Sequence, residues 1–101
     1  MGAVTDVRVR DETMTGREIE SWVLPGLPDE MTARELVAMR VRLAGGSAGW
    51  ERQAEAACAA FERNAFVMIA GERQVDDLDE VIHLARAAEV AFIRLVPLVG
   101  G

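Results

Sequence analysis

The chain has 101 residues, half of them apolar, and a formal net charge of −6. One domain of this size can bury a core without disulfides or metals. The single cysteine, Cys58, excludes an internal disulfide, and the first residues lack the pattern of an export signal, so we expect a reduced, cytoplasmic protein. No apolar run approaches the roughly 20 residues of a membrane span, which argues against a membrane protein. All 11 basic residues are scattered arginines, which argues against nucleic acid as a partner.

The N-terminal part predicts two strands joined by a hairpin. Residues 4–10 alternate between Thr or Val and charged side chains, which is the pattern of a half-buried strand. Residues 11–16 are polar and end on a glycine, as hairpin loops do. A second strand is predicted over residues 17–24, ended by the proline-rich residues 25–28.

The inward face of this second strand stays open. Ile19 and Val23 compete with Trp22 and Leu24 for the core, because both pairs can point inward only across a bulge. An outward-facing Trp22, with Leu24 beside it, would mark a surface for a partner or for self-association.

Two helices are predicted next. Thr32 and Glu35 form a capping box, in which each side chain can accept a hydrogen bond from the other residue's backbone amide, so a helix begins there. It is expected to end at Gly45 and Gly46. A second helix is predicted from residue 47 or 48 to residue 63, with Asn64 as its stop and Trp50 anchoring it to the sheet.

The remaining residues predict mainly strands. An apolar run and a brief edge strand are followed by an acidic loop around Leu78, a turn and a final strand. Their predicted ranges are 65–70, 73–75, 76–80, 86–88 and 89–96.

Gly100 and Gly101 follow this last strand and Pro97. Two residues without a Cβ form a thin thread that can enter a narrow channel and leave a terminal carboxylate open to attack. Such a terminus can be a substrate for activation, although glycine-rich ends without any chemistry are also common.

The element order, the capping box at Thr32 and the ending over residues 89–101 together resemble a ubiquitin-like β-grasp protein. The ending is similar to those of the sulfur carriers of molybdopterin and thiamin synthesis and of bacterial ubiquitin-like modifiers. The resemblance implies an α+β fold: a mixed four- to five-stranded sheet with central, parallel first and last strands, and a main helix. The domain would cover residues 1–96, with an extra helical segment at 45–64 before the third strand, and residues 97–101 would form a flexible, projecting tail.

The resemblance implies a modifier that is not itself an enzyme. An activating enzyme would use ATP and magnesium to adenylate the Gly101 carboxylate, and a partner cysteine would then take the acyl group as a thioester. Pro97, Leu98, Val99 and Gly100 would thread the partner's channel. A conjugating enzyme, a deconjugating metalloprotease and protein targets are the further implied partners. Two alternatives remain, a sulfur carrier with a C-terminal thiocarboxylate and a self-associating structural or interaction domain.

Other candidate residues favour structural roles. Cys58 lies on an apolar helical face and is expected to be buried. His83 has no second histidine or cysteine to complete a zinc site, and residues 76–80 lack the spacing of a calcium loop, so we predict no metal site. Asp11 and Glu12 are placed in a loop, and no catalytic group is predicted.

Overall fold

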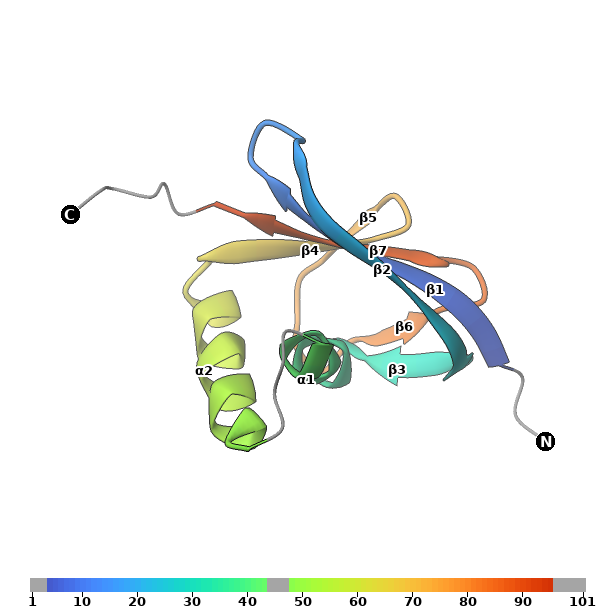
Figure 1. The fold of residues 1–101 in the computed structure, drawn as a ribbon, viewed down its shortest axis with the longest axis horizontal. Helices are drawn as coiled ribbons and strands as arrows, with labels where there is room; N and C mark the ends of the chain where they lie inside the picture. The colour runs from blue at the N-terminus through green and yellow to red at the C-terminus, as the bar shows by residue number, and fades with distance from the viewer. Residues whose placement is uncertain (1–3, 44–47, 96–101) are drawn as a thin grey trace.

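The computed structural model describes residues 4–43 and 48–95, and the elements within them form a mixed α+β fold (Figure 1). Two helices lie on one side of the main sheet. In chain order the elements are β1 (Val4–Thr13), β2 (Glu18–Pro28), β3 (Glu30–Thr32), α1 (Ala33–Leu43), α2 (Trp50–Glu62), β4 (Phe66–Ala70), β5 (Arg73–Val75), β6 (Val81–His83) and β7 (Glu89–Arg94).

The main sheet has five strands in the order β2-β1-β7-β4-β5. β1 and β7 run parallel at its centre, with Val9 opposite Val90, whereas the other neighbours are antiparallel. The first and last described strands are therefore adjacent, as expected, and the mixed sheet with two helices is confirmed.

The N-terminal hairpin is longer than predicted. β1 continues to Thr13 and β2 continues to Pro28, so the predicted loop at residues 11–16 and the predicted end at Pro25 are both wrong. β2 tolerates its prolines because it is an edge strand. Gly26, with φ +70°, lies at a register shift and donates its N–H to Asp6 Oδ1 at 3.2 Å. Such a bulge lets the strand continue past a break in regular pairing.

The start of α1 is fixed by its own side chains and by a distant loop. The Thr32 N–H donates to Glu35 Oε1 at 2.8 Å and the Glu35 N–H donates to Thr32 Oγ1 at 3.1 Å, which confirms the capping box. The N–H groups of Ala33 and Arg34 donate to the carbonyls of Glu80 and Leu78, both at 2.9 Å. The acidic loop at residues 76–80 thus satisfies helix donors that have no partner within the helix.

A second, two-stranded sheet supports this junction. β3 pairs antiparallel with β6, with Met31 opposite Ile82. Neither strand was expected, and β6 occupies part of a region in which helical and strand signals compete. The predicted turn before the last strand lies slightly earlier in the chain, at residues 84–86.

The helix and strand that follow lie close to their predicted places. α2 ends at Glu62, and Asn64 then adopts a φ of +62°, a left-handed conformation that asparagine tolerates better than most residues. β4 and the short edge strand β5 are both confirmed. The predicted helix end at Gly45 and Gly46 falls outside the described residues.

The core lies between the inner face of the sheet and the two helices. Its fully buried side chains come from β1, α1, β4, β5 and β7 and from the turn after β6; they are Val7, Val9, Leu36, Val37, Met68, Val75, Leu84 and Val90. Within residues 4–43 and 48–95, neither helix has the length and apolar character that crossing a membrane requires.

Candidate functional site

The predicted activation site lies outside the described residues. Gly101, Gly100 and the residues predicted to thread a partner's channel, Pro97, Leu98 and Val99, therefore stay predictions, as does the domain division at residue 96. Before them, β7 ends at Arg94, and the Leu95 N–H donates to the Ala65 carbonyl at 3.0 Å. The described chain thus reaches the end of the sheet in its central strand, between β1 and β4.

A groove with a volume of about 410 Å³ lies at this same end of the sheet. We call it the end groove, because the last residues of β1 and β7 contribute to its lining together with both helices. Its apolar lining residues are Ile19, Val37, Val41, Ala57, Ala65, Phe66 and Phe92. The ring centroids of Phe66 and Phe92 lie 6.0 Å apart at an interplanar angle of 57°. The volume falls in the range of roughly 300–1,000 Å³ that small-ligand sites have.

A buried ion pair forms one side of the end groove. Arg40 of α1 donates from Nε to Asp11 Oδ1 at 2.8 Å and from Nη2 to Asp11 Oδ2. Asp11 is only 9% exposed, and this pairing satisfies both of its oxygens. The Trp22 ring lies 4.7 Å from the guanidinium carbon of Arg40, within the range of a cation–π contact. Arg40 is therefore held by both a carboxylate and an indole ring.

Two more charged side chains line the end groove. Glu12 accepts a hydrogen bond from Arg10, which also bonds Glu89, and these two bonds raise the pKa of Arg10. Arg94 is exposed and makes no ion pair with any residue in the described part of the chain. Asp11 is paired with Arg40, and Glu12 shares Arg10 with Glu89, so Arg94 is the charged lining residue without an ion-pair partner in residues 4–43 and 48–95.

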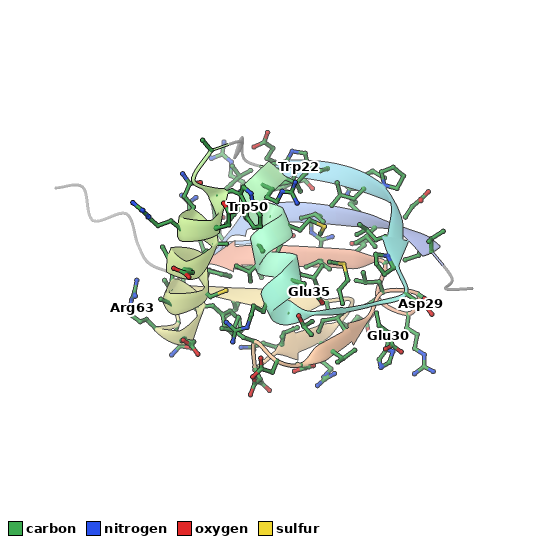
Figure 2. All side chains as sticks on the ribbon, turned by 90° about the horizontal axis from the view of Figure 1, so that it is seen from below. Trp22, Asp29, Glu30, Glu35, Trp50 and Arg63 are labelled. Atoms are coloured by element: carbon green, nitrogen blue, oxygen red, sulfur yellow. The ribbon has the colours of Figure 1, made fainter. Side chains whose placement is uncertain are left out.

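Both tryptophans contact arginines of α1. Figure 2 shows both beside the C-terminal half of α1. Trp22 and Leu24 are half-buried and pack against the core, so Trp22 does not have the outward-facing position that would mark a partner surface. The Trp50 ring lies 4.9 Å from the guanidinium carbon of Arg42 on α1, so it contacts the neighbouring helix rather than the sheet as predicted.

A second register shift between β1 and β2 determines which side chains of β2 face the core. Asp11 pairs with Glu20 and Glu12 pairs with Glu18, which leaves Ile19 without a partner in β1. Ile19 lines the end groove and is 51% exposed, whereas Val23 is 67% exposed. The open choice between the two pairs is therefore settled in favour of Trp22 and Leu24 as the residues that pack on the core.

Cys58 lies where it was expected, and His83 lies on the surface. Cys58 is buried beside the core, and burial raises the pKa of its thiol. A high thiol pKa disfavours the reactive thiolate. His83 is exposed, with Nδ1 3.4 Å from Glu30 Oε2. In the described ranges, no three His, Cys, Asp or Glu side chains gather closely enough to hold a metal ion.

Placing Asp11 and Glu12 in a loop was wrong, because both belong to β1. The sequence carries a signal that could have located the ion pair. Asp11 continues the every-second-residue pattern of Val7 and Val9, and Arg40 continues the helix face of Leu36 and Val37. A carboxylate and a guanidinium at the ends of two core-facing stripes are expected to pair, because burial of either charge without a partner is costly.

Comparison with protein-family models, with curated proteins and with solved structures gives no match for this chain.

Proposed function

We propose that the chain is a ubiquitin-like protein modifier of the bacterial type, with a β-grasp fold and with Gly101 as the residue that becomes activated. The observation that carries the proposal is the strand order β2-β1-β7-β4-β5, with β1 and β7 parallel at the centre. Leu95 directly follows the central strand β7, and Gly101 comes six positions later in the chain. The diglycine therefore follows the central strand, as the sequence resemblance leads us to expect.

Further support comes from the helices. α1 begins at a capping box directly after the N-terminal hairpin and β3, which is where the main helix of a β-grasp fold is expected. α2 occupies residues 50–62, inside the segment interpreted as an insertion before the third strand of that fold. A compact sulfur carrier does not need this second helix, so α2 favours the modifier over the carrier.

The proposed chemistry uses the Gly101 carboxylate as the acyl group. One carboxylate oxygen attacks the α-phosphorus of ATP in the activating enzyme, and magnesium pyrophosphate leaves. A cysteine thiolate of the partner then attacks the acyl carbon, a thioester forms and AMP leaves. Pro97, Leu98, Val99 and Gly100 thread the channel, and Pro97 limits the conformational entropy that is lost on insertion. The chain contributes the acyl group and a docking surface, while ATP, magnesium and the nucleophile belong to the partner.

The test is whether covalent products depend on the two glycines. We would incubate the full chain with a candidate activating enzyme, ATP and magnesium, and look for a protein adduct that a thiol reagent cleaves. A chain that lacks Gly100 and Gly101 should give no adduct, whereas the matched control Asp77→Asn, in an exposed loop, should react like the unaltered chain. Failure of the full chain to form a thiol-sensitive adduct with its cognate enzyme would overturn the proposal.

Intact mass and recovery from cells separate the alternatives. A sulfur carrier would give free chain that is heavier by the difference between a sulfur and an oxygen atom, without conjugates. A modifier gives conjugates of larger mass. Cellular function that survives removal of both glycines would instead favour a structural or interaction domain.

A further inference from the structure

The end groove has no part in the proposed activation chemistry, yet it combines two features of a small-ligand site. Its lining is mainly apolar, with the Phe66 and Phe92 rings and aliphatic side chains from both helices. Its charged side chains are few, which is typical of sites where polar groups orient an otherwise apolar ligand.

The cationic side chains of the end groove indicate that the polar end of such a ligand is an anion. Asp11 accepts hydrogen bonds from Nε and Nη2 of Arg40. The third nitrogen, Nη1, has no hydrogen-bond partner among residues 4–43 and 48–95. Asp11 and Trp22 fix the position of this guanidinium, which reduces the entropy that a ligand must remove from it. Arg94 supplies a second guanidinium that no carboxylate in these residues neutralises.

We propose that the end groove binds an aliphatic monocarboxylate, with the hydrocarbon chain on the apolar lining and the carboxylate toward Arg94 and Arg40 Nη1. An aliphatic amine is disfavoured, because both acidic lining residues are already paired with arginines while Arg94 is not. A fatty alcohol would gain the same apolar burial but not the charge-assisted hydrogen bonds.

Calorimetry with sodium decanoate below its micelle concentration tests this assignment on the full chain. We expect one saturable site with a dissociation constant on the order of 100 µM. Arg94→Gln should weaken binding by about three- to tenfold, because Arg94 is exposed and its charge is partly screened. The matched control Arg63→Gln removes an exposed charge at the end of α2, outside the groove lining, and should leave the affinity unchanged.

A second variant tests the apolar part. Ala57→Leu adds side-chain volume at the groove lining and should weaken decanoate binding by more than tenfold, with circular dichroism to verify folding. Decanol should bind at least threefold more weakly than decanoate, and this difference should become smaller in Arg94→Gln, which retains only Arg40 for the carboxylate. In a Trp50→Phe background, the fluorescence of Trp22 gives an independent readout beside Arg40.

Several results would overturn the proposal. These are an absence of saturable binding, equal effects of Arg94→Gln and Arg63→Gln, or full affinity in a folded Ala57→Leu variant. Decanoate binding that occurs only after removal of residues 96–101 would assign the groove to this chain's own C-terminal segment. A dimer in solution that keeps decanoate out of the groove would assign it to a second copy.

Discussion

The Asp11–Arg40 pair should be the strongest single polar contribution to stability in the described residues. Asp11→Asn keeps the shape of the acid, and Arg40→Met keeps an apolar stem against Trp22, so each variant removes mainly one charge. The two side chains are 13% and 21% exposed, between a surface pair and a fully buried one. Removal of either partner should therefore lower the free energy of unfolding by about 2–3 kcal/mol, below the roughly 3–5 kcal/mol of a fully buried pair.

A double-mutant cycle measures the interaction itself. Urea unfolding of the two single variants and of the double variant should give a coupling free energy of about 1.5–2.5 kcal/mol. A loss of about 2 kcal/mol in a chain of this size corresponds to a fall in Tm of roughly 8–16 °C.

The exposed pair Arg34–Asp79 provides the matched control. Its N···O distance is 3.5 Å and its side chains are 53% and 83% exposed, so its coupling should stay below about 0.5 kcal/mol. A coupling for Asp11–Arg40 no larger than for this control would refute the reasoning that burial strengthens the pair.

Three further predictions concern single residues. Thr32→Ala should lower stability to urea by about 1 kcal/mol because the capping box is lost, and Thr32→Ser should restore most of it. Because burial raises the pKa of the Cys58 thiol, iodoacetamide should modify the native chain at least tenfold more slowly than the urea-unfolded chain. The unfolded thiol loses its proton first, so stability should fall as pH rises above about 8.5, and a Cys58→Ala variant should lack this component. Gly71→Ala should destabilise by more than about 1 kcal/mol, because φ is +64° and the new Cβ would lie 3.2 Å from Ala87 Cβ. Gly26→Ala shares the positive φ without a neighbour within 4 Å, so thermal melts should show a smaller loss; equal losses would exclude the steric contribution.

Features with a local cause could be predicted from the sequence. The capping box at Thr32 involves residues three positions apart, and the stop at Asn64 needs only its own backbone conformation. β4 follows from a short apolar run closed by Gly71, and β5 is the brief strand that pairs back directly after that turn. Each of these signals lies within a few residues, so no knowledge of the tertiary arrangement is required.

Features that depend on a distant partner could not be predicted. Continuation of β2 past Pro25 is possible because β2 is an edge strand and Gly26 forms a bulge, and both facts emerge only when the register against β1 is known. The inward position of Trp22 depends on that register too. The three-residue strands β3 and β6 are too short to give a periodic signal.

The central position of β7 also determines how the chain can fold. The β1–β2 hairpin and the β4–β5 hairpin are local in sequence, but neither is joined to the other until residues 89–94 pair with both. Val9 must meet Val90 across 81 positions of chain, and closing so long a loop costs entropy before any contact offsets it. We therefore expect a barrier dominated by docking of the last strand, with refolding in milliseconds to seconds rather than microseconds. Until that step, each hairpin presents an unpaired edge, and this is the stage at which the chain is most exposed to aggregation.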